Sequence, residues 1–370
     1  MTKAFNYVDH KILISKLNAY GVRGNVSDLL ESYLTNRRQI TIINKVCPRS
    51  KTLIPYKSSM RNVTYGVPQG STLGPLLFII YINDFPSATN FPMTMFADDS
   101  TVVFNNDKYD IIESEINTSL TSLITWLEKQ NLKINLNKTT IMNFGQKANK
   151  KPDLDIKYKD KKIVESDVTK FLGLHVENTL KWTTQIDKVC SKLNQYAYML
   201  YMLNKTVNQK TTLTAYHGLV ASTLRYGIIF WGNATGKESI FKAQKRCIRA
   251  ICNLRSTDSC KPYFKKLNLL TMPSMYIFET AMFVKRNWSK FSEVGSSRRS
   301  GKLHLVPAKT ALLHKSIFAM APKIYNKLPK CLRLKETATF KFKLQLFLVQ
   351  QAYYSVEEFM NDLNINDTVM

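Results

Sequence analysis

Thr94-Met95-Phe96-Ala97-Asp98-Asp99-Ser100-Thr101-Val102-Val103-Phe104 is the stretch that decides the fold of the N-terminal half of this chain. Apolar, β-prone residues stand on both sides of two adjacent acids, which predicts a β-hairpin whose tip carries Asp98 and Asp99. Carboxylate oxygens on a rigid turn are ligands that Mg²⁺ prefers. Taken alone, however, two acids in a turn are more often ordinary turn chemistry.

A glycine-rich segment precedes this hairpin: Tyr65-Gly66-Val67-Pro68-Gln69-Gly70-Ser71-Thr72-Leu73-Gly74-Pro75. It leads into the apolar, helix-compatible stretch 76–82, and its exposed amides favour close approach of a nucleotide. A simpler interpretation is a tight loop with a Ser/Thr helix cap and a proline in the first turn. That interpretation leaves Gln69 unexplained.

The elements around these two segments predict an α+β fold followed by a mostly helical region. Asp9 is expected to cap a helix that ends near Gly21. Apolar spacing predicts further helices at 26–34, 112–127, 186–200 and 213–224, β-rich segments at 39–43 and 140–144, and a loop or hairpin tip at 145–162.

Composition indicates a nucleic-acid partner. The chain has 370 residues with 53 Lys and Arg against 27 Asp and Glu, a net charge of +26, and such an excess favours a polyanion. The longest apolar run, Leu76 to Ile82, is too short to span a bilayer, so no membrane association is expected. No secretory signal is visible, which favours an intracellular location without distinguishing nucleus from cytoplasm. The six cysteines lack the spacing of a disulfide framework or a zinc site, and zinc is not expected.

The order of the motifs resembles the reverse transcriptases of non-LTR retrotransposons, particularly the jockey-like group. Five of that family's motifs have counterparts here, A to E in order: Ala4-Phe5-Asn6-Tyr7-Val8-Asp9-His10, Gly66 to Pro75, Phe96-Ala97-Asp98-Asp99, Leu136-Asn137-Lys138-Thr139 and Phe171-Leu172-Gly173-Leu174. The downstream segments Trp182 to Leu193, Leu224-Arg225-Tyr226-Gly227 and Gln244-Lys245-Arg246 are also similar to the family.

The resemblance implies a polymerase architecture with five parts. These are a partial palm at 1–165 that combines an antiparallel sheet with helices and lacks the upstream fingers, a primer grip and helical thumb at 166–235, a basic helical region at 236–288, a linker at 289–303 and a C-terminal region at 304–370.

The resemblance also implies RNA-directed DNA polymerisation with Mg²⁺, or with Mn²⁺ in its place, an RNA template, a DNA primer and deoxynucleoside triphosphates. Asp98 and Asp99 would hold two metal ions together with a carboxylate five residues before Phe5, a position directly before Met1. We therefore expect this chain to be an N-terminally truncated fragment with impaired polymerisation. Asp9 is expected to cap a helix and not to replace the missing ligand.

Other roles follow from the same resemblance. Phe5 would contact the incoming sugar, although it is alternatively an ordinary core aromatic. Pro68, Gln69 and Gly70 would contact the nucleotide or its template base. Lys138 would lie near the departing phosphate, where a cation stabilises charge or donates a proton, unless it is simply a surface lysine.

Two further features concern bound nucleic acid. Leu172 and Gly173 would approach the primer backbone, although Gly173 is also explained by a simple turn. A helix near residue 245 is expected to present a stripe for a phosphate backbone while its apolar side packs inward. The stripe consists of Lys242, Lys245, Arg246 and Arg249, and the apolar side of Phe241, Cys247, Ile248 and Ile251.

Two alternatives to an active polymerase remain open. One is a non-catalytic nucleic-acid-binding protein derived from a reverse transcriptase, or a transposon relic, because the charge does not depend on the catalytic carboxylates. The other is a chain that folds poorly alone, since an incomplete domain leaves an apolar face uncovered.

Overall fold

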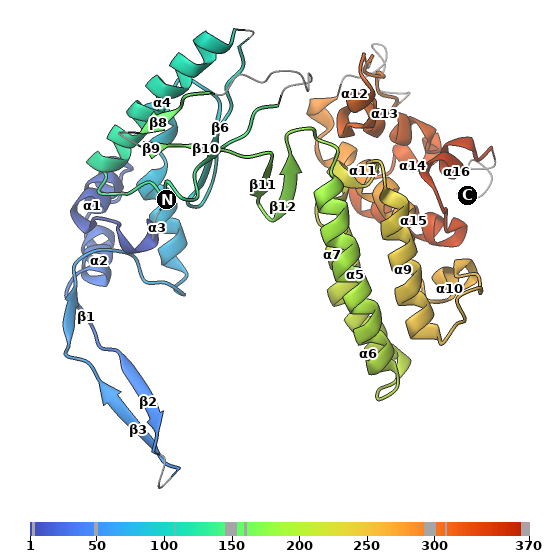
Figure 1. Cartoon of the computed structure of the whole chain (residues 1–370), viewed down its shortest axis with the longest axis horizontal. Helices are drawn as coiled ribbons and strands as arrows, with labels where there is room; N and C mark the ends of the chain where they lie inside the picture. Colours follow the sequence, from blue (N-terminus) through green and yellow to red (C-terminus); the bar gives the residue numbers. More distant parts are fainter. Residues whose placement is uncertain are drawn as a thin grey trace. The chain divides into compact units, whose positions relative to one another are not determined.

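The computed structural model forms two compact units (Figure 1). The first unit comprises Met1–Ile141 and Lys147–Ser166, and the second comprises Met142–Gln146 and Asp167–Met370. The structure describes residues 1, 4–47, 51–106, 108–144, 154–158, 161–291, 301–307 and 309–363.

The first unit contains the helices that the sequence predicts, together with two short 3-10 turns among the described residues. They are η1 (Ala4–Asn6), α1 (His10–Ala19), α2 (Asn25–Leu34), α3 (Leu73–Ile82), η2 (Phe85–Ala88) and α4 (Tyr109–Lys129). The predicted cap is confirmed, because Asp9 Oδ1 accepts hydrogen bonds from the amides of Lys11 and Ile12. The apolar face predicted for the second helix is only partly buried: Leu34 is buried and Leu30 and Tyr33 pack against the core, but Val26 and Leu29 are exposed.

The strands of the first unit pair only in twos over the described residues. The pairs are β1 (Arg37–Gln39) with β4 (Arg61–Val63), β2 (Ile42–Val46) with β3 (Leu53–Lys57), β5 (Met93–Phe96) with β6 (Asp99–Val102), β7 (Thr140–Ile141) with β10 (Val164–Glu165), and β8 (Lys157–Tyr158) with β9 (Lys161–Lys162). All are antiparallel except β7 with β10. A mixed helix-and-strand fold is therefore confirmed, and the continuous sheet of a palm stays a prediction.

The core of the first unit lies around α3. This helix is apolar on all sides, and Leu77, Phe78 and Tyr81 are fully buried with Leu13 and Leu17 of α1. Burial of such side chains contributes roughly 1.5–3 kcal/mol each. The outer side of the same helix is exposed, including Leu76 and Ile79. Part of this apolar helix is therefore uncovered.

The second unit begins with a hairpin, β11 (Val168–Phe171) and β12 (Leu174–Glu177), and continues as a helical array. The apolar faces predicted near 186–200 and 213–224 are found on helices. The helical elements are α5 (Thr183–Asn204), α6 (Gln209–Tyr216), a π-helical turn (His217–Ala221), α7 (Ser222–Arg225), α8 (Ile228–Trp231), α9 (Lys237–Cys252), α10 (Lys261–Lys266), α11 (Met272–Arg286), η4 (Trp288–Lys290), α12 (Ala311–Lys315), α13 (Ile317–Lys327), α14 (Lys330–Arg333), α15 (Thr337–Gln351) and α16 (Val356–Asn361).

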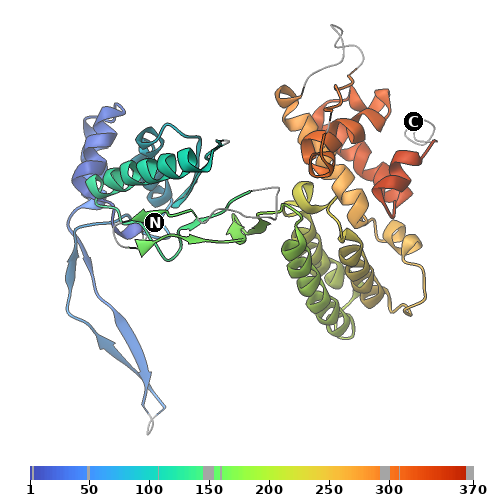
Figure 2. The ribbon, with the colours of Figure 1, turned by 45° about the horizontal axis from the view of Figure 1, so that its top comes forward.

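Helices α5 and α9 of this unit run side by side (Figure 2). Helix α11 lies in the core of the unit. Every side chain of α11 from Met272 to Val284 is buried or half-buried. Residues 292–300 of the expected linker, and residues 145–153 and 159–160 of the expected loop, lie outside the described residues. Within the described ranges, helices that combine the length and the hydropathy needed to cross a bilayer are absent.

Candidate polymerase site

The acidic hairpin forms where the sequence predicts it, but its two-residue turn carries only the first of the two acids, and Asp99 begins β6. Phe96 pairs with Asp99 across the β5–β6 ladder, so Ala97 and Asp98 form a two-residue turn. Ala97 adopts a positive φ of 49°, a conformation that tight hairpin turns use and that L residues rarely adopt. Asp98 is half-buried and Asp99 exposed, and neither carboxylate forms an ion pair with another described residue. Both therefore remain available as oxygen ligands.

The start of the chain lies beside this turn. The amino group of Met1 is 3.4 Å from the carbonyl oxygen of Asp98, within hydrogen-bonding distance. This contact joins two positions that are far apart in the sequence. A residue attached to the Met1 nitrogen would therefore begin next to the acidic turn.

The glycine-rich loop is held against the segment that follows Met1. The amide of Gly66 donates to Val8 O over 2.7 Å, and the amide of Val67 donates to Phe5 O over 2.9 Å. Gly66 has φ +85°, and a Cβ there would lie 2.9 Å from both Asn6 Cα and Phe5 O. The close approach of the two backbones therefore requires glycine at this position.

Side chains reinforce the same contact. Gln69 Nε2 donates to Asn6 Oδ1 over 2.9 Å, and His10 Nε2 lies 2.8 Å from Gly66 O. The amide of Gln69, which a helix cap alone does not explain, thus connects the loop to the start of the unit. The sequence singled out neither the buried His10 nor its contact, since a lone histidine after a helix cap gives no signal.

The cap interpretation holds for the later part of the loop. Ser71 Oγ donates to Pro68 O over 2.7 Å and accepts from the amide of Gly74 over 2.9 Å. A Cβ on Gly74 would lie 2.5 Å from Pro68 O, so this glycine is needed for packing. Gly70 also has a positive φ of 82°, but nothing lies within 4 Å of its Cβ position. Gln69 and Gly70 are the exposed residues at the tip of the loop.

Phe5 combines a core contact with an accessible edge. Its ring stacks on Phe78 of α3 with centroids 4.4 Å apart, yet the residue is only half-buried. Lys138 is exposed in the turn after Asn135, and the structure describes no contact between its side chain and Asp98 or Asp99. Phe5 thus lies against the glycine-rich loop, whereas Lys138 takes no part in that contact among the described residues.

The turn predicted to grip a primer belongs to the second unit. Leu172 and Gly173 have positive φ values of 44° and 86° and connect β11 to β12. The Tyr226 hydroxyl donates to Leu172 O, and a Cβ on Gly173 would lie 3.3 Å from the Tyr226 ring. Tyr226 therefore fixes this turn, a role that the sequence motif Leu224-Arg225-Tyr226-Gly227 did not reveal.

A mainly apolar cavity of about 590 Å³ lies against the same turn within the second unit. Its polar lining includes the Arg225–Glu279 ion pair, whose atoms are 3.6 Å apart. The lining residues are Phe171, Leu172, Leu174, Val176, Trp182, Arg225, Tyr226, Gly227, Ile228, Ile229, Phe230, Glu279, Phe283, Arg286 and Asn287.

The basic stripe on α9 is only partly free. As predicted, the opposite face packs inward with Phe241, Cys247, Ile248 and Ile251 buried. Lys245 Nζ lies over the Phe241 ring, 4.8 Å from its centroid, and Arg249 donates to Asp258 O over 3.2 Å. Of the four basic side chains, Lys242 and Arg246 are the exposed ones, and Arg246 donates to Asn194 Oδ1 over 2.9 Å.

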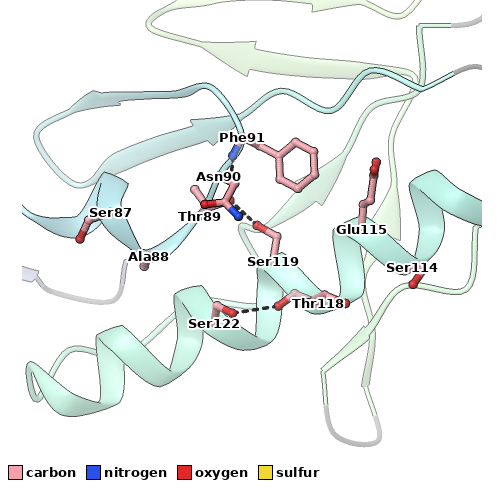
Figure 3. A pocket seen from close by; sticks show the side chains of 10 residues that line it. All are labelled: Ser87, Ala88, Thr89, Asn90, Phe91, Ser114, Glu115, Thr118, Ser119 and Ser122. Carbon is pink, nitrogen blue, oxygen red and sulfur yellow. Dashed lines mark hydrogen bonds between the residues drawn. The ribbon is translucent and has the colours of Figure 1, made fainter.

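A second hollow of about 270 Å³ lies between η2 and α4 in the first unit (Figure 3). Hydroxyl groups dominate its wall, and Thr89 Oγ1 and Ser119 Oγ lie 2.7 Å apart. None of the residues predicted for the polymerase site lines it. In the second unit, burial raises the pKa of the Cys247 thiol to about 12.

Comparison with known proteins agrees with the motif order. The family model described as "Reverse transcriptase (RNA-dependent DNA polymerase)" matches residues 1–176. The probable RNA-directed DNA polymerase from transposon BS of Drosophila melanogaster is 27% identical over 308 residues, 77% of this chain and 32% of that protein.

Two other Drosophila melanogaster proteins are similar. The probable RNA-directed DNA polymerase from transposon X-element is 26% identical over 214 residues, which cover 56% of this chain and 22% of that protein. The RNA-directed DNA polymerase from mobile element jockey is 25% identical over 193 residues, which cover 48% of this chain and 20% of that protein. The chain thus spans about a third or less of the length of these relatives.

Proposed function

Because residues 1–176 match the reverse transcriptase family model, we propose that this chain forms part of the RNA-directed DNA polymerase of a jockey-like non-LTR retrotransposon. One observation carries the proposal: the Gly66–Gln69 loop is hydrogen-bonded to the Phe5–Asn6 segment, while Met1, four residues before Phe5, contacts the Asp98 turn. These are the counterparts of motifs A, B and C, and in the first unit they converge on one another.

Each residue has a role that its surroundings support. Asp98 and Asp99 supply oxygen ligands from one side for Mg²⁺ or Mn²⁺, which when bound stabilises the attacking and leaving oxygens of nucleotidyl transfer. The accessible edge of Phe5 contacts the sugar of a deoxynucleoside triphosphate. Exposed Gln69 and Gly70, with Pro68 behind them, contact the nucleotide or its template base.

The metal site needs a further ligand. Within the described ranges no group of three His, Cys, Asp or Glu side chains could hold a metal ion. The resemblance places the other carboxylate directly before Met1, whose nitrogen lies 3.4 Å from Asp98 O. We expect the chain that starts at Met1 to bind divalent ions weakly and to polymerise poorly, and an aspartate in front of Met1 to strengthen both.

Two proteins test this expectation: the chain extended before Met1 by a short segment that ends in Asp, and the same extension ending in Asn as the matched control. Mn²⁺ binding followed by electron paramagnetic resonance is expected to be tighter for the Asp extension, and Asp98→Asn removes that gain. Primer extension on an RNA template is expected to follow the same order, with at least about a 100-fold difference. Equal Mn²⁺ affinity of the two extensions would contradict the ligand assignment.

The expectation for the unextended chain has its own test. Robust Mg²⁺-dependent incorporation by this chain, abolished by Asp98→Asn, would show that a third carboxylate before Met1 is not needed.

A second candidate function is nucleic-acid binding without catalysis, which the net charge of +26 favours. It predicts a salt-sensitive affinity for RNA that Asp98→Asn leaves unchanged. In that case both extended proteins bind RNA equally and neither extends a primer.

Exposed Lys242 and Arg246 on α9, together with the Leu172–Gly173 turn, are the contacts with template and primer that we assign to the second unit.

A further inference from the structure

The β2–β3 hairpin projects from the rest of the first unit as a two-stranded ribbon (Figure 2). Its two strands pair with each other through five residues on each side, from Ile42 opposite Lys57 to Val46 opposite Leu53. Every residue of both strands is exposed. An isolated two-stranded hairpin is at best marginally stable in water, so this ribbon is suited to a partner that covers it.

The ribbon has apolar side chains on both faces. Because opposed residues share a face, Ile43, Ile54 and Tyr56 lie on one face with Lys45. Ile43 is 66% exposed and Tyr56 58% exposed. The other face carries Ile42, Val46, Leu53 and Lys57. Exposed apolar side chains gathered in this way mark a binding surface.

The charge of the segment restricts what that partner can be. From position 37 to position 61 the sequence contains seven basic residues and not one Asp or Glu. Lys45 and Lys57 are exposed, and neither forms an ion pair with another described residue. A second copy of the ribbon would bring like charges together, which costs free energy. The basic residues are Arg37, Arg38, Lys45, Arg49, Lys51, Lys57 and Arg61.

A polyanion that also exposes apolar surface matches both the exposed apolar side chains and the basic residues of the ribbon. A nucleic-acid duplex hides the faces of its bases in the stack, whereas a single strand presents them for stacking on aromatic and apolar side chains. We propose that the β2–β3 ribbon binds single-stranded nucleic acid, with Lys45 and Lys57 on phosphates and Tyr56 stacked on a base. The bound strand crosses the edge of the ribbon, because Lys57 lies on the face opposite Lys45 and Tyr56. In the polymerase proposed above, on which this assignment rests, that strand is the template.

The test uses the full chain and a matched pair of variants. The ribbon variant combines Lys45→Gln, Tyr56→Ala and Lys57→Gln. The control variant combines Lys341→Gln, Phe342→Ala and Lys343→Gln on α15, where all three side chains are exposed and Phe342 is 64% exposed. Both variants lose two positive charges and one exposed aromatic ring. Circular dichroism checks that both remain folded.

Binding is measured by fluorescence anisotropy with a labelled single strand of about 20 nucleotides, as RNA and as DNA, and with a hairpin duplex of the same length. We expect the ribbon variant to bind either single strand at least about tenfold more weakly than the control variant. The slope of log affinity against log salt concentration should be less steep for the ribbon variant than for the control variant by about 1.4, the contribution of two phosphate contacts with a single strand. The duplex should be affected less.

Three outcomes would overturn the proposal. The two variants bind the single strand equally, or the duplex loses as much affinity as the single strand, or light scattering shows a dimer that the ribbon variant dissociates. The binding assay does not depend on Asp98. Failure of the Asp-extended protein to extend a primer, while the ribbon variant still binds single strands more weakly than the control, therefore refutes only the polymerase proposal. Equal single-strand binding by the two variants, together with primer extension by the Asp-extended protein, refutes only the ribbon.

Discussion

Replacing Gly66 with alanine tests the contact that joins the glycine-rich loop to the start of the first unit. Gly66 has φ +85°, and a new Cβ would lie 2.9 Å from Asn6 Cα and from Phe5 O, both backbone atoms that cannot rotate away. The positive φ costs about 1–2 kcal/mol for alanine. Overpacking against backbone adds about 1–3 kcal/mol. We therefore expect Gly66→Ala to destabilise the first unit by about 2–5 kcal/mol.

Gly70→Ala is the matched control. Gly70 has nearly the same φ, +82°, but nothing lies within 4 Å of its Cβ position, so only the backbone strain of about 1–2 kcal/mol applies. The lower entropy of the unfolded chain affects both substitutions equally and cancels in the comparison. The difference between the two variants, about 1–3 kcal/mol, isolates the clash with Phe5 and Asn6.

Hydrogen exchange followed by mass spectrometry in increasing urea provides the measurement, because peptides from α1 and α3 report the first unit separately from the second. Both helices should lose protection at lower urea in Gly66→Ala than in Gly70→Ala. The loop would not be packed on Phe5 and Asn6 as described if the two variants agreed within about 0.5 kcal/mol.

Two further predictions concern the second unit. Burial raises the pKa of Cys247 to about 12, so its thiol stays protonated at pH 8. Iodoacetamide should therefore label exposed Cys331 at pH 8 and should label Cys247 only when the pH approaches 12 or the protein unfolds. Peptide mass spectrometry measures the labelling, and equal labelling rates of the two cysteines at pH 8 would contradict the burial of Cys247. Tyr226→Phe removes the hydrogen bond to Leu172 O and should destabilise the β11–β12 turn by about 0.5–1.5 kcal/mol. Faster hydrogen exchange confined to that hairpin is expected, and unchanged exchange there would show that the hydroxyl does not fix the turn.

The sequence by itself determined the local elements well. The apolar, acid-tipped segment 94–104 formed the predicted hairpin because β-prone flanks and a two-residue turn specify that structure locally. Asp9 capped α1 because its carboxylate needs only the nearby amides of Lys11 and Ile12. The inward face of α9 also followed from its spacing.

Only the tertiary structure decided which of these elements meet. The Gly66 backbone packs against Phe5 and Asn6, and the hydrogen bond from Gln69 to Asn6 spans 63 positions of the sequence. The approach of Met1 to Asp98 spans 97 positions. Such pairings depend on how helices and loops pack, which local spacing does not encode.

The same limit explains where the sequence interpretation failed. Spacing predicted an inward apolar face on the second helix. Its C-terminal part, with Leu34, packs inward, but Val26 and Leu29 are exposed because no described element packs over them. It predicted a basic stripe on α9, but aromatic and carbonyl partners occupy Lys245 and Arg249. Sequence determines which side chains an element offers, and the neighbours that tertiary packing supplies determine which of them remain free to bind.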